Sequence, residues 1–512
     1  MRPAFTGAVL ISTLAGCGDA GDPAATSAGA GASATASSGA GAGANGAGGA
    51  ATSSGTGGSG AGPTFRDRCE PSAAPEPPPP LRTFYVDADA GDDSSDGLTK
   101  DTAWKTLTKA NAAAQAGDLF LVRGTFVGQY IRPNTGGTAT DMIVYRVMSG
   151  ESSSIQEAEY GTAVWLTGVE YVVADGFDIT QNDDPASLGN GDWLRNCHIH
   201  DNSGYVRILG ADDTRVEDND IPTCGTYCFW VSEGSTKNQI LRNSIGTSTS
   251  VSFWLASPGN TIGYNDFANT LEENLALNGG ADQTTIECNS FRLAGTQAAD
   301  GYYTPSVRIG SNQNVIRYNL VYGNALEGIS FWVNANDNAM YHNVVWGNGG
   351  PDLRLLVDLD TGTIQNNTFR NNVFWNNNSS DDSHWNYQGT KGKVVVDTYH
   401  VGTDGWTDGS FGGNALENNV VGADASEIGK GWLLMIGYTK VAVFTLDEAA
   451  TQWPASIVAN LEADPQLADP ASGDFHLGDG SPCIDKGVPI EGLDFDGAAP
   501  DLGRFEQLEA SP

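Results

Sequence analysis

The apolar and polar positions between residues 196 and 372 repeat with a fixed period. The repeated unit is an apolar residue, two variable residues, Asn, one variable residue and a second apolar residue. Successive units are 24, 22, 24, 30, 24 and 24 residues apart, with their Asn at Asn219, Asn243, Asn265, Asn289, Asn319, Asn343 and Asn367. A second Asn follows in the last three units, at Asn324, Asn348 and Asn372. A period in the twenties made of short strand-like pieces indicates a solenoid of β coils.

Each coil of such a solenoid adds one strand to a growing parallel sheet, so equivalent residues lie about 4.8 Å apart. Stacked Asn amides can then hydrogen-bond from coil to coil, which explains why Asn recurs at one bend. A leucine-rich repeat also carries periodic Asn, but its Leu-x-x-Leu-x-Leu frame is absent here. The sequence therefore predicts an all-β fold, a parallel β-helix.

Different segments flank the repeats. Residues 83–86 and 118–122 have the pattern of strands, and the Ala-rich residues 108–116 between them are the best helix candidate. A short amphipathic helix at this place would cover the apolar interior at the open end of the solenoid. Residues 445–450 predict a second short helix near the other end.

Short motifs mark the two ends of the predicted solenoid. They are Tyr85-Val-Asp87, Gly91-Asp-Asp93, Trp104-Lys-Thr-Leu107 and Val122-Arg-Gly-Thr-Phe126, then Asp464-Pro-Gln-Leu467, Gly480-Ser-Pro-Cys-Ile-Asp485 and Pro500-Asp-Leu-Gly503. Together they resemble the ends of secreted right-handed parallel β-helix proteins of the pectin-lyase-like superfamily. The resemblance covers residues 83–506 and implies an N-terminal cap at 83–126 and a closing segment at 464–506. It is specific for the fold, because the same ends frame lyases, hydrolases, epimerases and proteins without an assigned reaction.

The N-terminal residues predict export. A short positive start and a small apolar run over residues 8–14 lead to Leu14-Ala15-Gly16-Cys17. Residues 1–17 thus resemble a bacterial lipoprotein signal peptide, cleaved before Cys17 and lipidated on its thiol; an ordinary secretory signal is the alternative. The Gly, Ala, Ser, Thr and Pro composition of residues 18–82 predicts a disordered tether. We expect an exported protein, anchored only through its lipid at the bacterial outer membrane or cell surface.

The net charge limits the possible binding partners, and the cysteine count bears on disulfide formation. The formal net charge of −36 argues against nucleic acid and anionic membrane surfaces. It would also repel an acidic glycan unless Arg or a bound cation offsets it locally. Six cysteines other than Cys17 permit disulfides in an exported chain, although their connectivity stays open and buried free thiols are equally allowed. We expect a monomer.

Each coil carries another strand 11 to 13 residues before its repeated Asn. The central residues of these strands are Arg207, Trp230, Trp254, Ala276, Arg308, Trp332 and Arg354. Their neighbours within each strand are apolar, so the alternation of side chains predicts that the central residues face outward. Indole faces stack on sugar rings and guanidinium groups bind carboxylates, which favours a groove for an acidic polysaccharide. The alternatives are that the protein's own loops cover this line of residues, or that the Trp side chains point inward.

A polysaccharide lyase is the leading enzyme hypothesis. Such an enzyme needs a base, and a cation or Arg to hold the uronate carboxylate. Arg308 is the candidate base, with Lys237 and Asp300 as further catalytic candidates. Tyr302 and Tyr303 lie in the insertion next to Arg308 and are expected to contact substrate.

Other site hypotheses remain open. Asp212, Asp213 and Glu217 could hold Ca²⁺, with solvated turn acids as the alternative. A glycoside hydrolase needs two carboxylates at a set separation, but the Gly-His-Gly and Arg-Ile-Lys motifs of the polygalacturonase-type group do not occur. A non-catalytic glycan-binding or adhesin-like surface solenoid is the other rival. We interpret the histidines of the repeat region as structural, namely His198, His200 and His342.

Overall fold

The computed structural model describes most of the chain after residue 63. The described residues are 64–232, 234–295, 304–332, 334–356, 364–375, 386–387, 390–391, 393–397, 411–422, 428–429, 431–436 and 441–508. They belong to a unit spanning Ala61–Pro512, which is separate from the unit Met1–Gly60. The expected signal peptide with Cys17, and the first part of the expected tether, lie outside the described residues.

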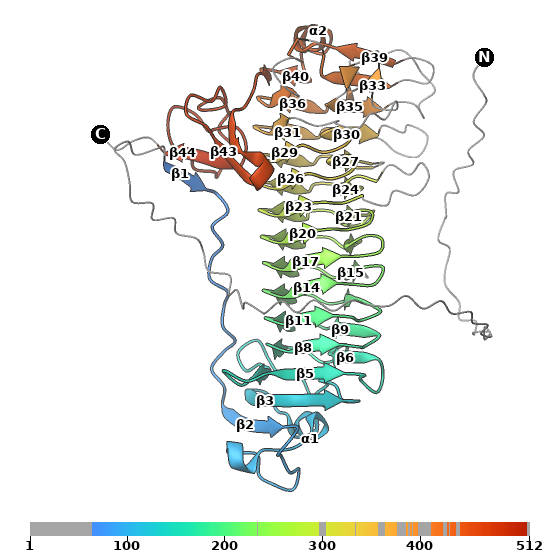
Figure 1. Ribbon diagram of the computed structural model, residues 1–512, viewed down its shortest axis with the longest axis vertical. Helices are drawn as coiled ribbons and strands as arrows, with labels where there is room; N and C mark the ends of the chain where they lie inside the picture. The colour runs from blue at the N-terminus through green and yellow to red at the C-terminus, as the bar shows by residue number, and fades with distance from the viewer. Residues whose placement is uncertain are drawn as a thin grey trace, which may run out of the picture. The chain divides into compact units, whose positions relative to one another are not determined.

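Three parallel sheets form the body of the protein (Figure 1). Sheet 1 consists of β6 (Thr162–Trp165), β9 (Asp184–Leu188), β12 (Val206–Leu209), β15 (Phe229–Ser232), β18 (Phe253–Leu255), β21 (Leu275–Leu277), β24 (Val307–Ile309), β27 (Ile329–Phe331), β30 (Leu353–Leu356), β35 (Val394–Asp397) and β38 (Leu433–Ile436), and ends with the antiparallel β39 (Val441–Phe444). Sheet 2 consists of β2 (Arg82–Asp87), β3 (Asp118–Val127), β4 (Ile143–Val147), β7 (Val172–Asp175), β10 (Trp193–Arg195), β13 (Arg215–Glu217), β16 (Gln239–Leu241), β19 (Thr261–Gly263), β22 (Thr285–Glu287), β25 (Val315–Arg317), β28 (Ala339–Tyr341), β31 (Thr368–Arg370), β36 (Ala415–Glu417) and β40 (Ile457–Val458). Sheet 3 continues from β3 through β5 (Ser153–Gln156), β8 (Asp178–Thr180), β11 (His198–His200), β14 (Asp220–Thr223), β17 (Ser244–Thr247), β20 (Asp266–Ala268), β23 (Ser290–Arg292), β26 (Leu320–Tyr322), β29 (Val344–Trp346), β32 (Val373–Trp375), β37 (Val420–Gly422) and β41 (Leu461–Glu462).

From β6 to β38 the chain visits sheets 1, 2 and 3 in that order in each coil, so equivalent strands stack in register. In sheet 2, for example, Ile240 pairs with Ile262, which pairs with Ile286, and all three side chains are fully buried. Phe267 and Phe291 stack in the same way from sheet 3, with ring centroids 5.0 Å apart. Alternation along each short strand thus fills one continuous apolar interior, as a parallel β-helix requires.

The repeated Asn side chains connect the coils at the bend between sheets 2 and 3. Asn243 donates from Nδ2 to Oδ1 of Asn265, and Asn265 donates in turn to Asn289, at 2.9 and 3.0 Å. The residue before each of these Asn has a left-handed backbone with φ between 52° and 60°; examples are Arg242, Tyr264, Cys288 and Tyr318. The bend and the ladder of amides therefore recur together.

One step of this ladder differs from the sequence prediction. Asn343 donates to Asn372, 29 residues further on, at 2.9 Å. Asn367, which we had placed after Asn343, belongs to a second ladder before the sheet 2 strands, where it accepts from Asn338. Asn367 and Asn372 fit the sequence repeat equally well, and only the pairing of the strands shows which of them continues the ladder from Asn343.

Short helices lie at both ends of the coils. The helix α1 (Leu107–Ala113) is capped by the Thr106 side chain, and its buried residues Leu107 and Ala110 join the interior. The helix α2 (Leu446–Gln452) begins at Thr445, which forms a reciprocal capping box with Glu448. Both predicted helices are confirmed, with boundaries shifted by one to three residues. Among the described residues, no helix has the length and apolar character that crossing a membrane requires.

Residues 64–81 differ from the tether we expected up to residue 82. The strand β1 (Thr64–Asp67) pairs antiparallel with β44 (Phe505–Leu508), near the far end of the described chain. Cys69 forms a disulfide with Cys288 of the β-helix, and the Arg68 guanidinium pairs with buried Glu506. Figure 1 shows this segment, the strap, running from β1 along the coils to β2. Side-chain bonds that residue composition does not reveal hold it in place.

The remaining described elements are short. They are η1 (Lys100–Thr102), β33 (Asn386–Tyr387), β34 (Thr390–Lys391), β42 (Leu467–Asp469), η4 (Pro470–Ser472) and β43 (Asp474–Leu477). A second disulfide joins Cys224 and Cys228, whereas Cys197 and Cys483 are free and buried. Burial raises the pKa of both free thiols to about 12, so they are inert apolar side chains.

Candidate functional site

The predicted outward line of residues exists on sheet 1. Strand pairing places one residue per coil side by side, and we call this the row: Arg207, Trp230, Trp254, Ala276, Arg308, Ser330 and Arg354. Phe229 and Val231, which flank Trp230, are fully buried in the interior, while Trp230 is partly exposed. The predicted parity is therefore confirmed, and the alternative with indoles inside is wrong.

Trp332 does not occupy the place that we predicted for it. Arg308 pairs with Ser330, so Trp332 lies two residues beyond the row on the same side of the chain. Its indole still reaches the row, because the Arg308 guanidinium lies over its ring at 5.0 Å from the centroid. The prediction paired Arg308 with Trp332, whereas the structure pairs it with Ser330. Apolar and other residues alternate along the chain from Ile329 onward, so a shift of two residues leaves the same side chains facing outward.

The aromatic faces of the row contact each other. Trp230 and Trp254 stack with centroids 5.4 Å apart and an angle of 12°, and Tyr205 stacks on Trp230 at 5.8 Å. Arg308 continues this stack, because its guanidinium lies 5.7 Å from the Trp254 centroid, above the buried Ala276. The rings therefore present edges outward, and a sugar would meet indole edges instead of the faces we had expected.

Every arginine of the row has a carboxylate partner. Arg207 lies 2.9 Å from Asp184, and Arg308 lies 3.0 Å from Glu273. The third arginine, Arg354, is bound by two acids, with Glu327 at 2.9 Å and Asp397 at 2.7 Å. The positive charge of each arginine in the row is thus neutralised by a carboxylate of the protein. A ligand carboxylate would have to displace that carboxylate in order to bind the arginine.

Glu273 is a residue that the sequence analysis missed. It precedes β21 and is buried, and burial raises its pKa to about 7 against the pull of Arg308. Glu327 precedes β27 at the equivalent position, is fully buried and accepts a hydrogen bond from Ser330 at 2.7 Å. Asp352 lies buried two residues before Arg354, and its burial raises its pKa well above the usual range although Lys393 opposes this. Buried acids therefore line one side of the row.

The other predicted catalytic residues are not gathered at the row. Lys237 is exposed in the turn between β15 and β16, three coils before Arg308. Asp300, Tyr302 and Tyr303 lie outside the described residues. In the described part of the chain, two surface pockets lie at the ends of the β-helix, one lined by Phe444 and Gln452 and the other by Asn111 and Tyr130. Neither pocket includes a residue of the row.

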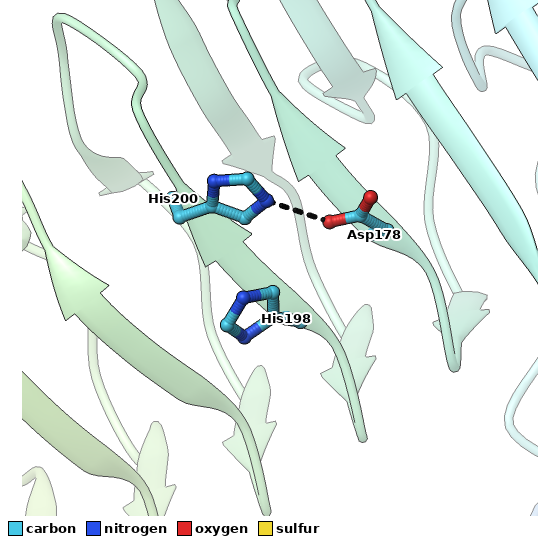
Figure 2. A group of neighbouring side chains, drawn as sticks. All are labelled: Asp178, His198 and His200. Carbon is cyan, nitrogen blue, oxygen red and sulfur yellow. Dashed lines mark hydrogen bonds and ion pairs between the residues drawn. The ribbon is translucent and has the colours of Figure 1, made fainter. Parts of the chain in front are cut away.

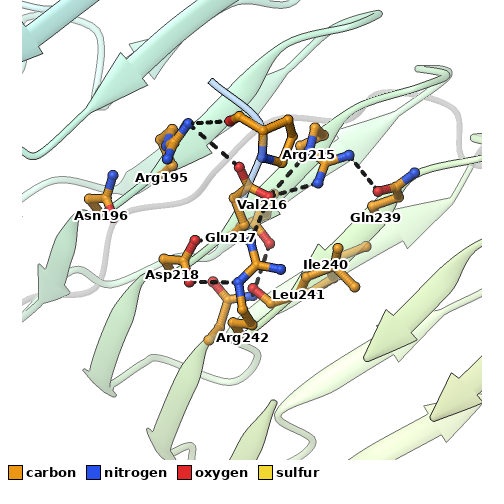
Figure 3. A network of polar contacts seen from close by, with 12 residues as sticks. Arg195, Asn196, Arg215, Val216, Glu217, Asp218, Gln239, Ile240, Leu241 and Arg242 are labelled. Atoms are coloured by element: carbon orange, nitrogen blue, oxygen red, sulfur yellow. Dashed lines mark hydrogen bonds and ion pairs between the residues drawn. The ribbon is translucent and has the colours of Figure 1, made fainter. Parts of the chain in front are cut away.

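The proposed Ca²⁺ ligands are not brought together. Glu217 is fully buried in β13, where Arg215 and Arg242 lie 2.8 and 2.9 Å from Oε2 and Arg195 lies 3.8 Å from Oε1 (Figure 3). Three guanidinium groups form ion pairs with this carboxylate, so Glu217 has a structural role and is not available as a Ca²⁺ ligand. Asp212 is exposed and accepts hydrogen bonds from Thr236, and Asp213 occupies a turn position with φ of 57°.

A different donor group forms on sheet 3. Asp178, His198 and His200 each offer one ligand atom within 4.8 Å of the others (Figure 2). Within the described residues, they are the group of His, Cys, Asp or Glu side chains close enough together to hold a metal ion. His200 Nε2 lies 2.9 Å from Asp178 Oδ1. Partial burial works to lower the pKa of His200, but hydrogen bonds to Asp201 and Asp178 raise it. These two histidines therefore differ from His342, which is buried beneath the strap and behaves as the structural residue we expected.

Comparison with known proteins agrees with the architecture. A family model described as right handed beta helix region matches residues 148–291. No curated protein matches the sequence. Similar solved structures include pectate lyase Pel9A, with 16% identity over 84% of this chain and 97% of that one and a TM-score of 0.46. The complex of XylC with xylose has 12% identity over 75% and 87%, with a TM-score of 0.47. The A-module of the mannuronan C-5 epimerase AlgE6 of Azotobacter vinelandii has 13% identity over 75% and 89%, with a TM-score of 0.37.

The strand pairing and the family model together identify the fold as a right-handed parallel β-helix. The likeness to the solved structures concerns the fold alone. Any assignment of chemistry must therefore come from the residues of this chain.

Proposed function

We propose that the protein binds an acidic polysaccharide along the row and cleaves it by β-elimination, as a polysaccharide lyase does. The observation that supports this is the pair formed by Arg308 and Glu273. A partly exposed guanidinium lies between two indoles and shares its charge with a buried carboxyl whose pKa is about 7. A group that titrates near neutral pH beside a carboxylate-binding cation suits proton transfer at a uronate.

In this proposal Glu273, and not Arg308, acts as the base. We had expected Arg308 to act as the base, but its guanidinium is held by Glu273 and is better suited to bind the uronate carboxylate. Glu273, freed from Arg308, would remove the proton beside that carboxylate. The electron pair of the broken C–H bond forms a double bond, and the glycosidic oxygen leaves and takes up a proton.

Two other functions compete with the lyase. Non-catalytic binding is favoured by the internal pairing of every arginine in the row, which is also the arrangement of a rigid docking face. Hydrolysis is favoured by the equivalent positions of Glu273 and Glu327, two coils apart. Two coil steps correspond to about 9.6 Å, near the carboxylate spacing of inverting glycosidases.

We infer the location in the cell from the N-terminal motif. The apolar run before Leu14-Ala15-Gly16-Cys17 supports export and lipidation on the Cys17 thiol. The protein would then act at the outer membrane or cell surface, held there only by its lipid. Mass spectrometry of the mature N-terminus, and fractionation of a Cys17→Ser variant, test this part independently of any activity.

Incubation of the full chain with a panel of polyuronates, with and without Ca²⁺, tests the function. Ultraviolet absorbance from an unsaturated uronate, lost in Glu273→Gln and kept in the exposed control Glu159→Gln, supports the lyase. New reducing ends without that absorbance would indicate hydrolysis instead. Binding by calorimetry that is lost in Arg308→Gln, without any product, would indicate a non-catalytic binder. Absence of both binding and product across the panel would overturn the proposal.

A further inference from the structure

We propose that Asp178, His198 and His200 form a binding site for a divalent transition metal of the Zn²⁺ type on the outer face of sheet 3. The site is separate from the row, which lies on sheet 1. It rests on side-chain geometry and does not depend on the proposed reaction.

Strand alternation aims both imidazoles outward. Within β11, Ile199 is buried in the interior, so its neighbours His198 and His200 share the outer face. Strand pairing then places Asp178 of β8 directly opposite His198. Figure 2 shows His200 pointing at the Asp178 carboxylate, with the His198 imidazole beside them. Two rigid strands therefore position the three donors.

Carboxylates outside this set orient both rings. The Nδ1 atom of His198 lies 3.0 Å from Asp220, and the Nδ1 atom of His200 lies 2.9 Å from Asp201. An Nδ1–H that donates to a carboxylate fixes the tautomer whose Nε2 lone pair is available to a metal. His200 Nε2 points at Asp178 at 2.9 Å, and a metal bound between them would take the place of the proton that they share. This arrangement of imidazole between carboxylate and ligand position is the one that metal-binding histidines adopt.

The donor set selects the class of metal. Two imidazole nitrogens and one carboxylate oxygen suit Zn²⁺, Co²⁺ or Ni²⁺, whereas Ca²⁺ requires six to eight oxygen ligands. A tetrahedral Zn²⁺ with bonds of about 2.1 Å holds its ligand atoms about 3.4 Å apart. The donor atoms lie within 4.8 Å of one another, so small rotations of exposed side chains bring them to that spacing.

The surroundings favour a cation and leave it accessible. Asp201 and Asp220 add two negative charges beside the three donors, and their side chains are 72% and 57% exposed. The side chains of His198 and Asp178 are 49% and 41% exposed, so a metal can enter from solvent without unfolding of the coil. Three protein donors leave coordination positions open for water or for an oxygen or nitrogen atom of a ligand.

Metal titration of the full chain tests the proposal. We expect one Zn²⁺ per chain by calorimetry, and with Co²⁺ the visible absorption bands of a nitrogen-ligated ion. The variants His198→Ala, His200→Ala and Asp178→Asn should each weaken Zn²⁺ binding at least about tenfold, and Asp220→Asn should weaken it by a similar factor through loss of ring orientation. The control is His476→Ala, in β43, which is several coils away from β8 and β11.

The outcomes separate clearly. Because the three site residues and Asp220 lie on the outer face, their variants should keep the far-ultraviolet circular dichroism of the wild type. Zn²⁺ affinity that is unchanged in His198→Ala and in His200→Ala, or reduced equally in His476→Ala, would overturn the site. So would the absence of stoichiometric binding in the wild type.

Discussion

Glu273 receives both nearby nitrogens of the Arg308 guanidinium on a single oxygen, with Nε and Nη2 each 3.0 Å from Oε2. The carboxylate is buried, whereas the guanidinium is partly exposed between two indoles. Protonation of Glu273 and binding of a ligand carboxylate to Arg308 would therefore each break the same ion pair. This coupling leads to the first two predictions.

The stability of the fold should fall as pH rises from about 4.5 to 7. The pKa of Glu273 is raised by burial from 4.5 to about 7, so the folded protein keeps a proton that the unfolded chain releases in this window. The contribution is roughly 3 kcal/mol at most. Glu273→Gln should flatten this part of the pH profile of the free energy of unfolding, measured by denaturant titration, while Glu159→Gln leaves it unchanged. A slope that persists in Glu273→Gln would contradict the assignment.

Removing Arg308 alone should cost more than removing the pair. Arg308→Gln leaves the Glu273 carboxylate buried without its cation, which costs about 3–5 kcal/mol when the acid is ionised. At pH 5 Glu273 is protonated, and the loss should be much smaller. The double variant Glu273→Gln with Arg308→Gln should be less destabilised at pH 8 than the sum of the single variants. Additive effects at both pH values would show that the two groups are not coupled.

The amide ladder should make a large contribution to stability at a single position. Asn265 donates to Asn289 and to the Ile240 carbonyl, and it accepts from the backbone and side chain of Asn243. Asn265→Ala leaves buried partners unsatisfied and should lower the free energy of unfolding by about 3 kcal/mol or more. The exposed Asn134→Ala is the control and should change it by less than about 0.5 kcal/mol.

The two disulfides should differ in their effect on stability. Cys69 and Cys288 are 219 residues apart, and the loop-entropy relation gives about 5 kcal/mol for a bridge of this span. Cys224 and Cys228 are only 4 apart, for which the same relation gives about 2 kcal/mol. Thermal unfolding of Cys69→Ser with Cys288→Ser, against Cys224→Ser with Cys228→Ser, measures the contrast. Equal losses would indicate that strain or residual structure outweighs loop closure.

The fold could be predicted from the sequence because its determinants are periodic. The Asn repeat marks each coil, and the alternation around Trp230 and Trp254 fixes which side chains face outward. Register was harder, since a shift of two residues at Trp332, or a choice between Asn367 and Asn372, leaves the same pattern of polar and apolar positions. Only the pairing of strands decides such cases.

The site was harder to predict than the fold. Glu273 and Glu327 each lie three residues before a row position, Ala276 and Ser330, but this shared spacing is visible only after the register is known. Asp178 meets His198 because the coil between them has 20 residues, fewer than the repeat suggests. Contacts that join such distant positions depend on coil length and not on local composition.

The pairing of β1 with β44 fixes the order in which the molecule can be finished. The partner strand of β1 is the last strand of the described chain, so this pair cannot form until residues 505–508 have been made. The Cys69–Cys288 bond, in contrast, joins the same strap to an inner coil and needs no residue beyond that coil. The strap is therefore fastened at two places that become available at different times, one in an inner coil and one at the last strand.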